Sequence, residues 1–164
     1  MYLALADDVV LRGATADGIA GTPMPAFASR SGGVLTDQQI DAIVNGIRTR
    51  WSNASVVAGR DVPPYADSSQ GDPERGADVF AMYCARCHGD RGQGGRGASS
   101  IVDGSYLALV SDQGLRTIVI AGRPELGAPD WRSNVSGQAM TPQEISDVVA
   151  WLSAQRPTFA GSRD

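Results

Sequence analysis

The chain has 164 residues, a net charge of −4, 42% hydrophobic residues and 20% charged residues. These values are typical of a globular chain with room for one complete domain and part of a second. No run of about 18 apolar residues occurs, so we expect no transmembrane segment. The net negative charge also gives no reason to expect a nucleic-acid partner.

Two stretches of the sequence resemble each other. The letters YLAL at residues 2–5 recur at residues 106–109, 104 positions later, and the same spacing pairs Gly18 with Gly122. With one extra residue in the second copy, residues 35–40 match residues 140–145. Because glycine and proline positions also match, the pattern favours one structural unit used twice over a chance similarity of helices.

The segment between the two copies, residues 52–70, contains a proline pair and several small polar residues, so we expect an extended linker there. A domain should follow at residues 71–160. Asp72 before Pro73 predicts the start of a helix that continues to Tyr83. Residues 112–121 predict a second helix, a capping box at residues 141–144 predicts a third over 142–155, and the five glycines within 89–97 predict a loop.

Cys84, Cys87 and His88 form a C-x-x-C-H motif, which is the spacing of covalent c-type haem attachment. A structural zinc site needs four ligands, whereas these are the only cysteines and the only histidine of the chain. A thioredoxin-like redox pair would leave His88 without a role and lacks its β-α-β context. A disulfide or an accidental match is the remaining alternative. The motif therefore favours one haem c, with each thiol bonded to a vinyl group and His88 as an iron ligand.

Gly76 and Phe80 before this motif, the glycine-rich loop after it and the final helix around Trp151 together resemble a class I cytochrome c. The resemblance implies an all-α fold around one covalent haem, with the first and last helices crossing where these three residues meet. The linker Pro63-Pro64-Tyr65 between two such units is similar to bacterial two-haem cytochromes c, and the whole chain then resembles the C-terminal part of such a protein. By that analogy residues 1–51 form the C-terminal half of such a unit, a partial and haemless half-unit without an attachment motif.

The sixth iron ligand departs from the family pattern. Met24 stands in a Met-Pro sequence like that of the family's ligand loop, but Ala128 occupies the matching place in the second copy. The chain has no lysine that could serve as the ligand. Met82 lies two residues before Cys84, on the same side of the haem as His88, and so cannot bind the opposite side of the iron. Met140 is therefore the first candidate, with Met24 or an open position as alternatives.

Other residues are assigned to the haem pocket by their type alone. Arg123 can pair with a haem propionate, although its residue type favours a solvated surface arginine somewhat more. Around the motif, three arginines can attract an anionic redox partner: Arg86, Arg91 and Arg96. The side chains suited to cover a porphyrin are Tyr106, Leu109, Leu115, Ile118, Pro129 and Trp131.

These features predict an electron carrier that is not itself an enzyme and that shuttles electrons between a respiratory or photosynthetic donor and an acceptor complex. An open iron site that binds gases or peroxide is the alternative. Since haem c is normally attached outside the cytoplasm, we expect a periplasmic or otherwise extracytoplasmic location. The first residues lack a basic region and turn acidic early, so we expect that Met1 does not begin the complete precursor.

Overall fold

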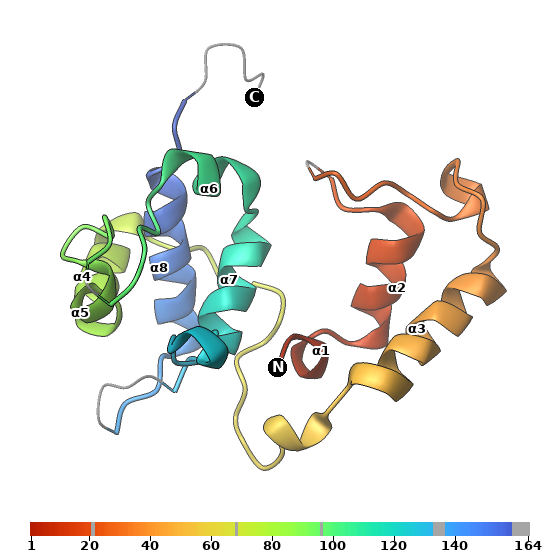
Figure 1. Cartoon of the computed structure of the whole chain (residues 1–164), viewed down its shortest axis with the longest axis horizontal. Coiled ribbons are helices and arrows are strands. Elements are labelled where there is room, and N and C mark those ends of the chain that lie inside the picture. The colour runs from red at the N-terminus through yellow and green to blue at the C-terminus, as the bar shows by residue number, and fades with distance from the viewer. Residues whose placement is uncertain (21, 68, 96, 133–136, 159–164) are drawn as a thin grey trace. The chain divides into compact units, whose positions relative to one another are not determined.

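A computed structural model describes residues 1–20, 22–67, 69–95, 97–132 and 137–158. Helices account for nearly all of its regular structure, and the described residues contain no β-strand beyond two isolated bridges. The expected all-α class is thus confirmed (Figure 1). The chain divides into two compact units, residues 1–62 and 63–164.

The first unit is built around two helices that pack on each other, α2 (Asp8–Asp17) and α3 (Asp37–Trp51). Its small core joins Ala16, Ala28 and Ile40. Three short elements complete the unit, namely α1 (Tyr2–Leu5), η1 (Ser29–Ser31) and η2 (Ala54–Val56).

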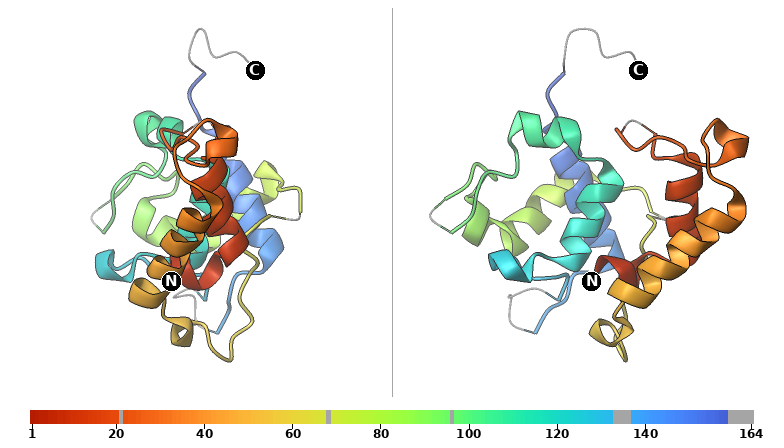
Figure 2. Two further views of the ribbon diagram at one scale, coloured as in Figure 1. Left: turned by 90° about the vertical axis from the view of Figure 1, so that its right-hand side faces the viewer. Right: turned by 45° about the vertical axis from the view of Figure 1, so that its right-hand side comes forward.

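The second unit is centred on α8 (Pro142–Ala154), against which α4 (Pro73–Tyr83) and α7 (Asp112–Ala121) both pack. In Figure 1 α8 lies between these two helices, and Figure 2 shows them from two further directions. The remaining elements are α5 (Ala85–His88), α6 (Gly104–Leu109) and η3 (Pro124–Leu126). One apolar core joins α6, α7 and α8 through Leu107, Leu115, Val149 and Leu152.

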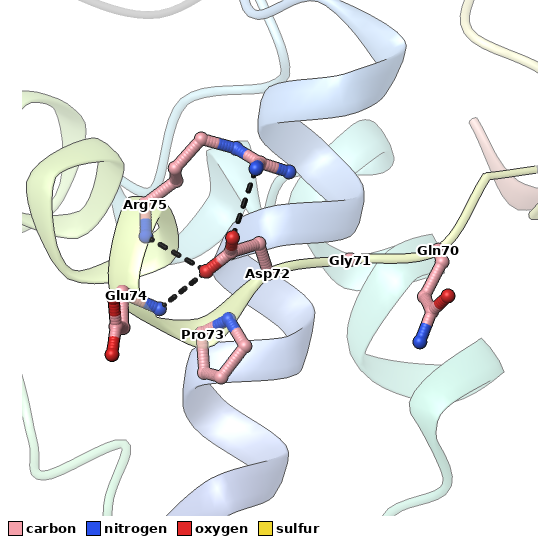
Figure 3. A pocket seen from close by; sticks show the side chains of 6 residues that line it. All are labelled: Gln70, Gly71, Asp72, Pro73, Glu74 and Arg75. Atoms are coloured by element: carbon pink, nitrogen blue, oxygen red, sulfur yellow. Dashed lines mark hydrogen bonds and ion pairs between the residues drawn. The ribbon is translucent and has the colours of Figure 1, made fainter.

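The start of α4 follows the sequence prediction. The Asp72 carboxylate accepts hydrogen bonds from the backbone N–H groups of Glu74 and Arg75 at 2.8 and 3.2 Å, and Pro73 occupies the first turn (Figure 3). This cap satisfies two of the N–H groups that a helix N-terminus leaves without partners. A hollow of about 460 Å³ beside the cap is lined by residues 70–75.

The crossing of α4 over α8 depends on a glycine. A Cβ atom added to Gly76 would lie 2.1 Å from the backbone oxygen of Asp147 and 2.7 Å from the Trp151 Cβ atom. Only a residue without a side chain permits this approach. One turn further along α4, Phe80 stacks on Trp151 with ring centroids 4.4 Å apart. These are the three residues that the resemblance placed at the crossing.

The duplicated sequence corresponds to duplicated local structure. Helices α2 and α7 both have ten residues and begin 104 positions apart. Each ends at a glycine with positive φ, 73° at Gly18 and 63° at Gly122. A Cβ at either position would collide with the backbone of the loop that follows, at Met24 O or Pro129 O. Both copies therefore need glycine for the same close approach.

A backbone hydrogen bond is also repeated. The N–H of Leu35 donates to Phe27 O at 2.8 Å, and the N–H of Met140 donates to Trp131 O at 2.8 Å. Immediately afterwards each copy has a complete capping box, at the N-termini of α3 and α8.

The boundary between the units falls inside the predicted linker. Val62 ends the first unit and Pro63 begins the second, so the last part of residues 52–70 packs with the second unit. The predicted end of the domain at residue 160 lies outside the described residues. None of the helices in the described ranges is long and apolar enough to cross a membrane.

Candidate haem site

The C-x-x-C-H motif is shaped by a break between two helices. The N–H of Cys84 still donates to Phe80 O at 2.8 Å, as in α4, but Cys84 has φ −120° and the chain turns there into the single turn of α5. Within this turn the N–H of His88 donates to Cys84 O at 3.0 Å. One turn thus carries both thiols and the imidazole, and the two cysteines are free rather than joined to each other.

The orientation of His88 is set by the loop that follows it. The Nδ1 atom lies 3.0 Å from the backbone oxygen of Ser99. A carbonyl oxygen can only accept, so Nδ1 must carry a hydrogen, which in the neutral ring leaves the lone pair of Nε2 for a metal. Two further bonds hold the loop in place, from the N–H of Gly94 to His88 O at 2.8 Å and from the N–H of Ile101 to Gly92 O at 2.9 Å.

A cavity of about 810 Å³ opens beside the two cysteines and His88. Cofactor sites commonly measure about 300–1,000 Å³, so this volume suits a haem. Helices α7 and α8 supply an apolar wall of five side chains, which are Leu115, Ile118, Val119, Val148 and Leu152. Phe80 and Tyr83, from the helix that leads into the motif, line it as well.

The polar side chains of the cavity include Tyr106 and Arg123. Burial raises the pKa of Tyr106, although the charge of Arg123 acts to lower it, so the phenol remains a neutral donor. The guanidinium of Arg123 is half exposed and pairs with Glu125 at 2.5 Å. A carboxylate bound in this cavity would therefore compete with Glu125 for Arg123.

Most residues assigned by sequence to the pocket are brought together here: the two cysteines and His88, with Tyr106, Leu115, Ile118, Arg123 and Pro129. The expectation for Leu109 was wrong, because its side chain is 83% exposed and does not line the cavity. Apolarity alone does not determine which face of a short helix a residue occupies.

Trp131 and Met140 are both buried, but neither is among the residues that line the cavity. Ala128, which stands in the position of Met24, does line it. Met140 as sixth ligand therefore stays a prediction. Sequence reasoning also missed Asp103 and the backbone oxygen of Ser99.

The chemistry of the thiols separates the remaining interpretations. Burial, and to a lesser extent the neighbouring Cys87, raises the pKa of Cys84 to about 11. The thiol is protonated at neutral pH, unlike the reactive cysteines of redox enzymes, whose pKa values are lowered. Within the described ranges, no three side chains of histidine, cysteine, aspartate or glutamate are grouped so that they could hold a metal ion. The residues present fit covalent haem better than zinc or disulfide exchange.

Several known proteins are similar in sequence to this chain. Residues 71–152 match the family described as cytochrome c oxidase, cbb3-type, subunit III. The cytochrome bc1 complex cytochrome c subunits of Mycobacterium bovis and Mycobacterium tuberculosis are each 28% identical over 131 residues, which is 77% of this chain. The chain spans only 43% of the length of these relatives.

Among solved structures, a thiosulfate dehydrogenase from Marichromatium purpuratum is 23% identical, with a TM-score of 0.42 over 80% of this chain and 30% of that one. The family match alone spans half of the chain, from the cap of α4 to the cavity wall of α8. The protein therefore belongs to the c-type cytochrome family described as cytochrome c oxidase, cbb3-type, subunit III.

Proposed function

We propose that the second unit carries one haem c and passes single electrons between a respiratory or photosynthetic donor and an acceptor complex outside the cytoplasm. The observation that carries this proposal is the cavity that opens beside Cys84, Cys87 and an oriented His88. Haem c supplies reversible one-electron exchange at its iron when bound. The mycobacterial relatives are named as subunits of a bc1 complex, which supports a membrane-bound respiratory complex as the partner.

Each group at the site has a defined part in this function. The thiols of Cys84 and Cys87 provide two covalent anchors, and Nε2 of His88 provides the proximal ligand while Ser99 O holds its ring. The apolar wall of α7 and α8 excludes water, which favours the less charged ferrous state and raises the reduction potential. Tyr106 and Arg123 provide a donor and a positive charge for the propionates.

We assign the sixth iron ligand to Met140. Its side chain is only 7% exposed, and its backbone is fixed by Trp131. Met82, the other methionine of this unit, is half exposed and lies on the helix that leads into the proximal motif. Methionine ligation would keep small molecules off the iron, as an electron carrier requires.

We further propose that residues 1–51 are the C-terminal half of a second cytochrome c-like unit. The repeated caps, glycines and backbone bonds support this interpretation. So does the exposure of Tyr2, Ile19 and Ile43, because the matching positions in the second unit, Tyr106, Arg123 and Val148, all line the cavity. In the first unit these positions would form one wall of such a pocket.

Absorption spectra of the purified protein test the function and the ligand together. We expect a low-spin haem that stays bound after denaturation, and a weak ferric band at the red end of the spectrum that indicates sulfur ligation and disappears in Met140→Ala. The variant Met82→Ala is the control and should keep that band. Haem that is released on denaturation would overturn the attachment, and a high-spin ferric spectrum in the parent protein would overturn the assignment of Met140.

A further inference from the structure

The second unit contains a buried arginine that takes no part in the proposed site. Arg116 on α7 is 2% exposed, although charged side chains are rarely buried without partners. Its Nε and Nη2 atoms donate to the backbone oxygen of Pro64 at 3.2 and 3.1 Å, and Nη1 donates to the hydroxyl of Ser146 on α8 at 3.1 Å. Two of these three bonds therefore reach the segment that enters the unit from the linker.

The counter-charge comes from the same segment. Asp67 Oδ2 lies 3.6 Å from Arg116 Nη1, and Asp67 Oδ1 accepts a hydrogen bond from the Ser146 hydroxyl at 2.8 Å. Gln113 of α7 also binds this segment, through Tyr65 O at 2.8 Å. We call residues 63–67 the strap. It is held to both α7 and α8 by hydrogen bonds of one polar cluster, in which Arg116 and Ser146 are buried and Asp67 is partly exposed.

In the first unit the matching arginine is less buried and pairs with the neighbouring helix itself. Arg12, 104 positions before Arg116, pairs with Asp41 at 2.8 Å and with Asp37 at 3.0 Å, both on α3. Asp41 occupies the position that Ser146 has on α8. In the first unit the arginine thus links its two helices directly. In the second unit the acid on the helix is replaced by serine, and the acid is supplied by the strap instead.

The residues of this cluster are close in sequence to residues that line the cavity. Leu115, which lines the cavity, precedes Arg116, and Val148 follows Ser146 by two residues. We infer that Arg116, Asp67 and Ser146 are positioning residues. They hold α7 and α8 together through the strap, so that docking of the strap sets how closely the two walls enclose the haem and hence its reduction potential. This inference rests on the proposed function, because it requires that the cavity holds the haem.

The comparison of the two units supplies the decisive variants. Asp67→Ala should release the strap and loosen the wall, whereas Asp67→Ala combined with Ser146→Asp should restore the direct helix-to-helix pair of the first unit. Asp61→Ala, an exposed acid in the same stretch of chain, is the matched control. The experiment measures two quantities on the full chain: the rate of chymotryptic cleavage after Tyr65 and the reduction potential of the haem.

We expect Asp67→Ala to speed cleavage about tenfold, because charge-assisted bonds hold the strap, and to lower the potential as water reaches the wall. The double variant should recover the potential and remain sensitive to cleavage, a combination that general destabilisation would not produce. A potential equal to that of Asp61→Ala despite fast cleavage would overturn the coupling. Unchanged cleavage would overturn the role of Asp67.

A failure of the proposed function would be recognised separately. Cleavage can also be measured on the protein without haem, so a chain that attaches no haem would still report whether Asp67 holds the strap. If Asp67→Ala does not fold, as judged by circular dichroism, Asp67→Asn keeps the hydrogen bonds and removes only the charge. The same two outcomes then decide the inference.

Discussion

Gly76 is the residue on which the packing of the haem unit depends most directly. A Cβ atom at this position would lie 2.1 Å from a backbone oxygen of α8, and a helix backbone cannot move aside as a flexible side chain can. We expect Gly76→Ala to lower the free energy of unfolding by about 3 kcal/mol, measured by urea denaturation.

A glycine of α3 provides the matched control. A Cβ added to Gly46 would meet no atom within 4 Å, so Gly46→Ala should stabilise the first unit by about 0.5–1 kcal/mol through its better helix propensity. Equal effects of the two substitutions would contradict the close crossing of α4 and α8.

Asp147 makes the stability of the same crossing depend on pH. Burial acts to raise the pKa of its carboxyl group, but hydrogen bonds from Arg75, from the N–H of Asp72 and from Gln143 outweigh it, so the pKa lies below its ordinary value of 3.8. A lowered pKa means that the carboxylate stabilises the fold above the ordinary value, and that this contribution is lost as the pH falls through 3.8 towards the lowered pKa.

Asp147→Asn tests this dependence. At neutral pH the free energy of unfolding of the variant should be about 2 kcal/mol lower than that of the parent, since hydrogen bonds to a charged group are lost. The variant should therefore unfold at a lower temperature. The gap should narrow as the pH falls below 3.8. Thermal unfolding followed by circular dichroism measures it. A gap that stays constant with pH would show that the charge of Asp147 contributes nothing.

At the scale of elements, both copies of the repeat begin their last helix with the same device. Thr141 accepts a bond from the N–H of Glu144, whose carboxylate in turn accepts from the N–H of Thr141, and Thr36 and Gln39 form the matching pair on α3. Thr141→Ala should lower the free energy of unfolding by about 1 kcal/mol and should also weaken the ferric sulfur band, because Met140 immediately precedes Thr141. Thr36→Ala should lower the free energy of unfolding by the same amount and leave the haem spectrum unchanged. Urea denaturation measures the first effect and absorption spectroscopy the second.

The elements that sequence predicted well are those with local signals. Two helix starts were predicted correctly, that of α4 from Asp72 and Pro73 and that of α8 from the capping box at residues 141–144. The predicted helix at 112–121 matches α7. What the sequence did not predict depends on tertiary contacts. The bond from His88 to Ser99 involves a backbone oxygen, which any residue type offers, and the exposure of Leu109 depends on how the short α6 is turned.

At the scale of the whole molecule, the distribution of charge bears on the partner. Most of the second unit's arginines that the structure describes have a carboxylate partner, namely Arg75, Arg116, Arg123, Arg132 and Arg156. Arg86 and Arg91 are exposed and make no ion pair with any residue that the structure describes, while Arg96 lies outside the described residues. The acid nearest in sequence is Asp90. Free cations beside the attachment site are suited to steer an anionic reagent to the haem.

Oxidation by ferricyanide, a small anion, measures this steering without a protein partner. Arg86→Gln with Arg91→Gln should slow the second-order reaction about threefold at low ionic strength, and the difference should vanish in high salt, where charges are screened beyond a few ångströms. Arg50→Gln with Arg60→Gln removes the same charge from the first unit and should have a smaller effect. If both pairs slow the reaction equally, net charge alone governs the rate; a slower reaction only for the pair at the motif would show that electrons leave the molecule beside Cys84 and Cys87.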